Sequence, residues 1–430
     1  MDLDGADITM LTAALQWSNH YTADEMDGEI LNDAIYKRDM QISEQFNVNI
    51  IHELVHGMMA GMEDVHNRLY NSVMAGDCSY DIFNASSAYI GSLVLEGMFR
   101  DQLTLPYLKP FEEWYFSRVN TNLRLGGRLY ISSGAYNFHT LSQNWCILFN
   151  RQLVSDYALT SPYELVNGGA WTFEAMQSMG NTVTSDMDGN GKMDGSDRYG
   201  MIGTQTEPFY AYTYGMGRLI ISDGSSGSPT LTDLNDRDVS IMDRIRNLYE
   251  SGIYFGTPSY EPTSKAIPMF ANGQGLFFTY NLSILENPDT REAGDFGILP
   301  LPKYDEEQKQ YYNSAFADIS AVPYVCLDPE TSALIIEAMN RLSFTDVLPT
   351  YYDIVLQNKL TRDDESRAML ELFVPSTTME AALLFYQTLG VDIVMCGPFL
   401  KTSYATWWVE NETALRERFE TILTSLSQLP

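Results

Sequence analysis

Basic side chains are scarce in this chain. Its 430 residues include 26 Lys and Arg against 57 Asp and Glu, which gives a formal net charge of −31. A charge of this sign repels phosphate backbones and anionic lipid headgroups, so it argues against nucleic-acid binding and against a membrane-surface protein. The sequence also has no run of about 18 consecutive apolar residues, and we therefore expect no membrane-spanning helix.

Cysteine is almost absent as well. The four cysteines, Cys78, Cys146, Cys326 and Cys396, are far apart, and none belongs to a CxxC pair. This spacing argues against a zinc ribbon, a thioredoxin-type site and a disulfide scaffold. We expect each cysteine to pack as a small apolar residue.

The residues that are present are typical of a globular α/β protein. Apolar residues make up 45% of the chain, and a length of 430 residues predicts two or three domains. The first 90 residues alternate between expected strands at 6–12, 48–51 and 80–83 and expected helices at 28–46 and 62–74. This alternation predicts βαβ units and a mostly parallel sheet.

The alternation is less regular further along the chain. Hydrophobic periodicity predicts strands at 129–131, 145–149, 276–279, 296–302, 319–323 and 324–326, helices at 171–179 and 328–342, and largely helical structure from Arg367 onward. Thr172 is expected to cap its helix, and Pro329 suits the first turn of the other.

An acidic loop at 186–197 carries the strongest local motif. It matches the calcium loop of an EF-hand, with Gly191 at the sharp turn of loop position 6. The predicted ligands are Asp186, Asp188, Asn190, the backbone carbonyl of Lys192, Asp194 and Asp197. Asp197 stands where a glutamate is usual and reaches less far. We predict a structural Ca²⁺ ion here, and a metal-free acidic turn is the alternative.

A second motif, HELVH at 52–56, matches the HExxH pattern of zinc peptidases. On a helix, its two imidazoles would lie one turn apart. On a strand, at roughly 3.3 Å per residue, they would lie about 13 Å apart and could not share a zinc ion. The β-branched residues before the motif favour the strand. A zinc peptidase stays an alternative function, with His52 and His56 as ligands, Glu53 as base and Glu63, His66 or Glu96 as third ligand.

Aromatic residues make up 12% of the chain, and many lie beside Asp, Asn and Ser at expected loops and strand ends. A flat ring packs against the C–H face of a sugar, while polar groups nearby orient its hydroxyls. The pattern therefore indicates a neutral polyhydroxylated ligand. For any single ring, core packing is the alternative.

Several short segments occur in an order that spans most of the chain. They are 33–36, 46–50, 75–82 (AGDCSYDI), 145–150, 169–173, 197–200, 296–304 (FGILPLPKY), 351–353 and 362–366. In this order they resemble the extracellular solute-binding proteins of ABC importers, family 1, the group that includes maltose-binding protein.

The resemblance implies a two-lobed periplasmic-binding-protein fold, type II-like, in which each lobe is a mostly parallel sheet flanked by helices. It implies three crossings between the lobes, near 130–142, 316–323 and 349–364. The first lobe is expected to comprise 1–131 and 320–360, and the second 132–319 and 361–430, including the calcium-type loop. The resemblance also favours the strand for the HELVH segment.

The resemblance further implies a non-enzymatic protein that captures an oligosaccharide and delivers it to the permease of an ABC importer. A peptide or amino-acid ligand is the other alternative. Ligand contacts are expected where strand ends face the cleft, because open α/β sheets bind ligands there. They are Trp17, Ser86, Ser87 and Tyr89 from the first lobe, and Trp145, Tyr214, Tyr280, Phe316 and Asp318 from the second lobe and the crossings.

The beginning of the sequence lacks the charged and apolar regions of a signal peptide. Composition leaves open whether the protein is cytoplasmic or is secreted and separated from such a peptide. The resemblance implies a monomer outside the cell or at its surface, lipid-anchored through a cysteine upstream of this sequence.

Overall fold

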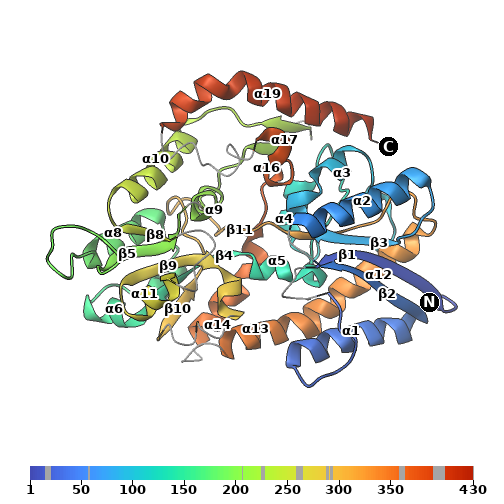
Figure 1. Ribbon diagram of the computed structural model, residues 1–430, viewed down its shortest axis with the longest axis horizontal. Helices are drawn as coiled ribbons and strands as arrows, with labels where there is room; N and C mark the ends of the chain where they lie inside the picture. Colours follow the sequence, from blue (N-terminus) through green and yellow to red (C-terminus); the bar gives the residue numbers. More distant parts are fainter. Residues whose placement is uncertain are drawn as a thin grey trace.

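A computed structural model describes the chain except for residues 15–20, 57–58, 206, 224–227, 258–264, 287–289, 291–293, 358–363, 391–401 and 430. The described residues form two α/β lobes that lie side by side (Figure 1). Each lobe is built around one sheet with helices on its faces, so the predicted two-lobed α/β fold is confirmed.

The sheet of the first lobe has the strand order β12-β3-β1-β2. Its strands are β1 (Ala6–Ala14), β2 (Val48–His56), β3 (Ile82–Ser86) and β12 (Asp318–Ala321). The first three are parallel, and β12 is antiparallel to β3. Helices α1 (Ile30–Phe46) and α2 (Met59–Ala75) connect the parallel strands. Glu29 caps α1 by accepting the N–H of Asn32, and Asn47 ends it in the left-handed conformation.

The sheet of the second lobe has the order β10-β4-β9-β5-β8. Its strands are β4 (Trp145–Asn150), β5 (Tyr199–Thr204), β8 (Tyr254–Thr257), β9 (Gly275–Asn281) and β10 (Phe296–Leu299). Every residue of β4, β5 and β10 is buried, as expected for strands covered on both faces. The sheet is mixed, because β9 is parallel to β5 but antiparallel to β4.

Helices cover both faces of this second sheet (Figure 1). The elements around it are α6 (Arg151–Asp156), α7 (Pro162–Asn167), α8 (Phe173–Val183), α9 (Glu207–Gly215), β6 (Ile221–Asp223), β7 (Pro229–Leu231), α10 (Asp236–Glu250), α11 (Ile267–Ala271) and η5 (Leu282–Glu286). Thr172 caps α8 through the N–H of Ala175. Helix α8 contacts β5 where Gly180 meets Gly200, and a Cβ on Gly200 would lie 2.4 Å from the Gly180 Cα.

The chain passes between the two sheets three times. The first passage, from β3 to β4, contains η1 (Ser87–Tyr89), α3 (Gly91–Leu95), η2 (Gln102–Thr104), α4 (Ser117–Leu123), η3 (Ala135–Asn137) and α5 (His139–Ser142). The second, from β10 to β12, contains β11 (Asn313–Ser314). The third runs from α12 (Pro329–Leu342) through η7 (Ser343–Val347) and α13 (Leu348–Gln357) to α14 (Asp364–Glu371). Helix α13 contacts both α1 of the first lobe and α14, which contacts β10 of the second lobe.

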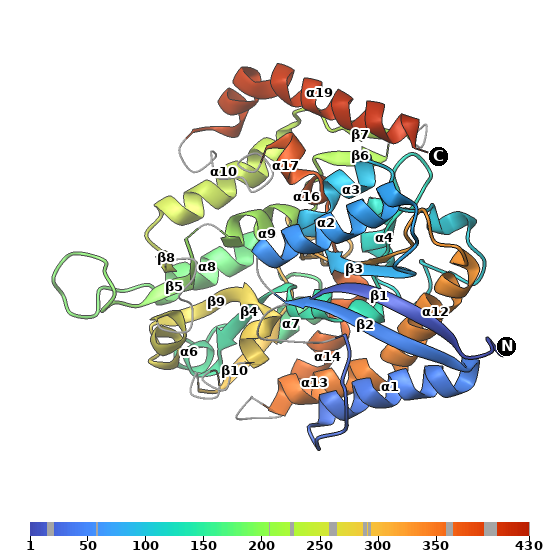
Figure 2. The same cartoon turned by 45° about the vertical axis from the view of Figure 1, so that its right-hand side comes forward.

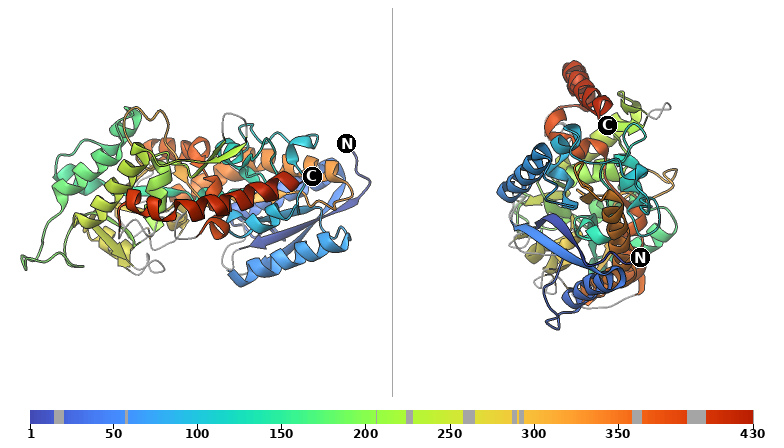
Figure 3. Two further views of the ribbon diagram at one scale, coloured as in Figure 1. Left: turned by 90° about the horizontal axis from the view of Figure 1, so that it is seen from above. Right: turned by 90° about the vertical axis from the view of Figure 1, so that its right-hand side faces the viewer.

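The last part of the chain lies against both lobes. It comprises α15 (Phe373–Ser376), β13 (Thr377–Thr378), α16 (Ala381–Leu384), α17 (Tyr386–Leu389) and α19 (Tyr404–Gln428). Helix α19 extends across the two lobes and contacts α3, α10 and β7 (Figures 1 and 3). The predicted lobe boundaries, including the assignment of 361–430 to the second lobe, stay a prediction.

Among the residues that the structure describes, no helix combines the length and the apolar sequence needed to cross a membrane.

Two expected strands are wrong. Residues 129–131 form no strand, because the N–H of Leu129 donates to the Asp101 carboxylate (3.0 Å) and its carbonyl accepts the N–H of Gln102 (2.7 Å). Residues 324–326 form a turn, in which the N–H of Cys326 donates to the carbonyl of Pro323 (3.1 Å). In both segments, backbone groups that a sheet would require are hydrogen-bonded within a loop or turn instead.

The HELVH segment lies in strand β2, which confirms the strand and removes the helix that a zinc peptidase needs. Three of the residues named for the zinc site have charged or polar neighbours elsewhere. His52 Nε2 lies 3.4 Å from Asp39 Oδ2, Glu53 pairs with Arg68, and His66 Nε2 lies 3.2 Å from Ser92 Oγ.

A buried carboxyl group, Glu380, joins the start of α16 to the start of β6. Its Oε1 accepts the N–H groups of Ile220 (3.0 Å) and Ile221 (2.6 Å), and its Oε2 accepts that of Ala382 (2.5 Å). Helix α16 also contacts η1 of the first lobe. Burial raises the pKa of Glu380 to about 7, although these N–H groups and the charge of Arg218 act to lower it.

We expect the substitution Glu380→Gln to remove one pH-dependent part of the stability. Folding raises the pKa of this carboxyl from 4.5 to about 7, so the folded state holds the proton more tightly than the unfolded chain. The free energy of unfolding must therefore fall as the pH rises from about 4.5 to 7, by about 3 kcal/mol. Urea unfolding of both proteins between pH 4.5 and 8 measures this difference. A difference that does not change with pH would contradict the prediction.

Candidate functional site

Ser86 and Asp318 lie opposite each other at one end of the first sheet. They are register partners in the antiparallel pair β3–β12, and the N–H of Ser87 donates to the carbonyl of Ala317 (2.8 Å). Because β1 and β3 are parallel, their carboxyl ends, at Ala14 and Ser86, lie on the same side of the sheet. Ligands of open α/β sheets bind at this side. The structure therefore brings two of the predicted contact residues, Ser86 and Asp318, to one candidate site.

The Asp318 carboxylate connects three separate parts of the chain. Its Oδ2 accepts a hydrogen bond from the Tyr21 hydroxyl (2.9 Å) and lies 3.0 Å from His139 Nδ1. The N–H of Asp318 donates to Thr140 Oγ1 (2.9 Å). Tyr21 precedes α1, whereas His139 and Thr140 belong to α5 in the first passage between the lobes. This carboxylate thus holds the first sheet against the passage that leads to the second lobe.

The pKa of His139 depends on its burial and on two acidic neighbours. Burial acts to lower the pKa of His139, but the charge and hydrogen bond of Asp318 and the charge of Glu286 outweigh it and raise the pKa. Burial raises the pKa of Glu286, although the hydrogen bond from the Tyr351 hydroxyl (2.8 Å) and His139 oppose the shift. Burial and the nearby Asp318 carboxylate raise the pKa of Tyr21. Asp318 and Glu286 therefore shift the protonation equilibrium of His139 toward its cationic form.

The polar groups continue into the second lobe. Gln143 Nε2 lies 3.2 Å from His139 Nε2, and Gln143 Oε1 accepts a long hydrogen bond from Asn281 Nδ2 (3.5 Å). Asn281 is the last residue of β9 and the register partner of Trp145, the first residue of β4. Since β9 is parallel to β5, this end of the second sheet is again the carboxyl end of its parallel strands. The two sheets thus contribute equivalent ends to the site.

Aromatic rings surround Tyr210 of helix α9. Trp145 Nε1 donates to the Tyr210 hydroxyl (2.7 Å), and the two rings meet edge to face with centroids 5.7 Å apart. The centroid of Tyr280 lies 5.9 Å from that of Trp145, and those of Phe316 and Tyr214 lie 6.0 and 6.4 Å from that of Tyr210. Such edge-on and tilted contacts are the favourable geometries of aromatic pairs. The structure therefore gathers four predicted rings into one group.

The rings of this group differ in exposure. Trp145, Tyr210 and Tyr214 are 4%, 5% and 2% exposed, whereas Tyr280 and Phe316 are half-buried. The half-buried rings retain surface that a ligand can cover, and the buried rings support them from behind. In this conformation, direct contact of Trp145 or Tyr214 with a ligand stays a prediction.

The remaining predicted contacts are less well placed. Ser87 is fully buried, and its hydroxyl has no hydrogen-bond partner among the described residues. Tyr89 is half-buried in η1 and packs against the core. Trp17 lies outside the described residues. Their role in binding a ligand also stays a prediction.

Five residues of the site were not predicted from the sequence: Tyr21, His139, Gln143, Tyr210 and Asn281. A local signal existed for two of them. Tyr210 is four residues before Tyr214 and therefore lies on the same face of α9, and Asn281 directly follows Tyr280 at the end of β9. The other three reach the site through contacts across long stretches of chain, which no local pattern reveals.

The acidic loop at 186–197 projects from the second lobe between α8 and β5 (Figure 2). Carboxylate oxygens of Asp186, Asp188 and Asp197 lie within 4.8 Å of one another. Asp197 is fully buried, and its two oxygens accept the N–H groups of Met187 and Asp194 (both 2.8 Å). Converging oxygen ligands on a tight loop fit Ca²⁺, which takes six to eight oxygen ligands. The residues present therefore fit the predicted ion.

No family model matches the chain, and no curated protein matches it. Solved structures do share its fold. A cyclo/maltodextrin-binding protein complexed with maltotetraose is 13% identical, with 99% of this chain and 98% of that chain covered and a TM-score of 0.60. The galacto-N-biose/lacto-N-biose I-binding protein of the ABC transporter from Bifidobacterium longum is 12% identical (99% and 97% covered, TM-score 0.56). An ABC substrate-binding protein from Listeria monocytogenes in complex with cycloalternan is 14% identical (99% and 100% covered, TM-score 0.52).

At these identities the likeness concerns the fold. It covers nearly the whole of each chain, so both lobes and the passages between them have counterparts in these proteins. The resemblance to extracellular solute-binding proteins is thereby confirmed at the level of the fold.

We expect the substitution Asp318→Asn to lower the pKa of His139. The carboxylate holds the proton on the imidazole, so its contribution to stability is present below the ordinary pKa of 6.5 and is lost as the pH rises through the raised folded-state value. NMR titration of the imidazole C–H signals measures the pKa directly, and the chain has only five histidines to assign. The control Ser86→Ala changes the register partner but keeps the charge. An equal pKa in both variants would contradict the prediction.

Proposed function

We propose that this protein is an extracellular solute-binding protein that captures an oligosaccharide between its lobes and delivers it to the permease of an ABC importer. The observation that carries the proposal is one group of polar and aromatic side chains at equivalent ends of both sheets. Asp318 and Ser86 come from the first sheet, Tyr280 and Asn281 from the second, and His139 from the passage between them.

The chemistry of this group suits a neutral sugar. The half-buried rings of Tyr280 and Phe316 supply flat apolar surface, and Ser86, Gln143 and Asn281 supply hydroxyl and amide groups. A peptide or amino acid needs a positive partner for its carboxylate. In the group of side chains around Asp318 the basic residue is His139, and Asp318 already engages it. An oligosaccharide is therefore favoured over the peptide alternative.

The proteins with the same fold support this choice, since their structures contain maltotetraose, lacto-N-biose and cycloalternan. We propose that the protein is not an enzyme and that its ligand stabilises a closed arrangement of the lobes, because the ligand makes more contacts in that arrangement than in the open one. We further propose that the protein acts as a monomer outside the cell, lipid-anchored through a cysteine upstream of this sequence.

We also propose that the 186–197 loop binds a structural Ca²⁺ ion. Asp186, Asp188, Asn190, Asp194, Asp197 and the carbonyl of Lys192 would hold it. The ion would offset the repulsion among converging carboxylates and fix the loop between α8 and β5. It supplies no step of ligand binding, because the loop leads into the amino end of β5, whereas the site lies at the carboxyl end of β9, which is parallel to β5.

We expect neutral oligosaccharides, and not peptides or amino acids, to stabilise the protein in a thermal-shift screen. A ligand at 100 times its Kd adds about 2.7 kcal/mol to the free energy of unfolding, which is readily detected.

For the sugar that responds, Tyr280→Ala should weaken binding at least about tenfold in calorimetry, because the sugar loses its contact with the ring. The matched control is Tyr70→Ala, an exposed tyrosine on α2, which should bind as the wild type does.

Two outcomes would count against this function. A peptide response beside a flat sugar panel favours the peptide alternative. Stoichiometric zinc bound through His52 and His56 would revive the peptidase. Equal affinity of the two tyrosine variants would remove Tyr280 from the site while leaving the binding function in place.

We expect Ca²⁺ to bind with one ion per chain and to raise the midpoint of thermal unfolding relative to the protein in EDTA. Asp188→Asn should reduce the affinity at least about tenfold, because it removes the charge of one oxygen ligand. The control Glu250→Gln removes an equally exposed acid from α10 and should leave binding unchanged. Calorimetric titration that detects no saturable site, or equal affinity of the two variants, would refute the calcium site.

A further inference from the structure

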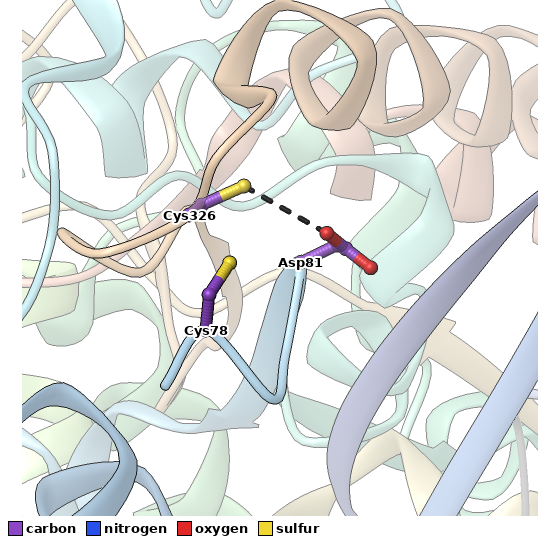
Figure 4. A group of neighbouring side chains, drawn as sticks. All are labelled: Cys78, Asp81 and Cys326. Carbon is purple, nitrogen blue, oxygen red and sulfur yellow. Dashed lines mark hydrogen bonds between the residues drawn. The ribbon is translucent and has the colours of Figure 1, made fainter. Parts of the chain in front are cut away.

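Cys78 and Cys326 lie next to each other although roughly 250 residues separate them in the sequence. Cys78 belongs to the loop between α2 and β3, and Cys326 to the turn between β12 and α12. Their sulfur atoms and an oxygen of Asp81 all lie within 4.8 Å of one another. Figure 4 shows the three side chains converging on one space. Both cysteines also pack in one apolar cluster, as expected for a cysteine. Cys146 is fully buried, and Cys396 lies outside the described residues.

The two thiols have different surroundings. Cys78 is half-buried, and its sulfur accepts the N–H of Leu327 (3.1 Å). Cys326 is 1% exposed and lies 3.3 Å from Ser332 Oγ and 3.8 Å from Asp81 Oδ1. Burial raises the pKa of the Cys326 thiol to about 11. Cys78 is thus the accessible nucleophile, and Cys326 lies behind it with a carboxylate beside its proton.

We propose that Cys78 and Cys326 form a reversible disulfide, with a small disulfide such as oxidised glutathione as the oxidant. The Cys78 thiolate attacks one sulfur of the oxidant, which forms a mixed disulfide and releases one glutathione thiolate. Cys326 then attacks the Cys78 sulfur while its proton passes, by way of the neighbouring Asp81 carboxylate, to the second glutathione thiolate as that thiolate leaves. In sum, two protein thiols are oxidised to one disulfide and one glutathione disulfide is reduced to two thiols.

A disulfide fits this pair better than a metal ion does. Structural zinc sites have four protein ligands, and three groups converge here. Asp81 is partly engaged already, because its Oδ2 accepts the N–H of Thr9 (2.9 Å). A buried thiol that keeps its proton is also a poor zinc ligand, since zinc binds the thiolate. Zinc binding is therefore the competing outcome of the test.

The bond would join the two separate stretches of chain that build the first sheet. It lies at the beginning of β3, whereas Ser86 and Asp318 lie at the other end of that strand. Cross-linking residues so far apart in sequence strongly restricts the unfolded chain. We therefore expect the disulfide to stabilise the first lobe and to leave ligand contacts unchanged. This inference does not depend on the proposed function.

The test uses the full chain, incubated at pH 8 with oxidised glutathione or with a reductant, then denatured and treated with N-ethylmaleimide. The reduced protein should take up four maleimides, one for each cysteine, and the oxidised protein two. Peptide mapping without reductant should yield one cross-linked peptide that contains Cys78 and Cys326. Oxidation should raise the midpoint of thermal unfolding by about 5 °C or more.

Variants separate this pair from the other two cysteines. Cys78→Ser and Cys326→Ser should each lose the cross-linked peptide and the rise in the midpoint, while Cys146→Ser should keep both. Peptide mapping of the wild-type protein tests the proposal even if a cysteine variant fails to fold. Four maleimides after oxidation, glutathione retained on Cys78, or a cross-link to Cys396 would overturn the proposal. The proposal would also be overturned if zinc protected Cys78 and Cys326 from maleimide and a chelator restored their labelling.

Discussion

The return of the chain to the first sheet is the constraint on which the rest of this structure depends. Strand β12 pairs with β3 only after the chain has built the second sheet. Neither lobe is therefore a continuous piece of sequence, and the passages between them must lie side by side at the lobe interface. The pairing of Asp318 with Ser86 places the Asp318 carboxylate beside His139 of the first passage. Backbone pairing in one sheet thus positions a side-chain contact between two passages.

The candidate site combines acidic groups with a histidine, although the chain as a whole is strongly acidic. Asp318 and Glu286 are acidic, and both favour the cationic form of His139 between them. A second buried carboxyl, Glu380, is satisfied differently, by three backbone N–H groups where α16 begins. Buried acids are stable in a protein only when such partners offset the loss of hydration. Apart from the local contact of Glu380 with Ala382, these contacts join elements that are distant in sequence.

The two ends of strand β3 have different chemistry. Polar groups gather at its carboxyl end, where Ser86 faces Asp318, and Cys78 and Asp81 precede its amino end. The ends of this five-residue strand lie about 13 Å apart, at roughly 3.3 Å per residue. A change at the cysteine pair can therefore alter the stability of the lobe without altering the groups around Asp318.

Local sequence determined much of the fold of this protein. Periodicity and capping located β1, α1, β4, β9 and α12, and the β-branched residues before HELVH correctly favoured a strand over a helix. The resemblance extended this to the two-lobed architecture. These features depend on short-range sterics and on which face of an element is apolar. Tertiary structure decided whether 129–131 joined a sheet, because the loop at Asp101 took its backbone groups first. It alone placed His139 beside Asp318 and Cys78 beside Cys326, since the register of β12 sets those contacts and no local pattern encodes the register between segments so far apart.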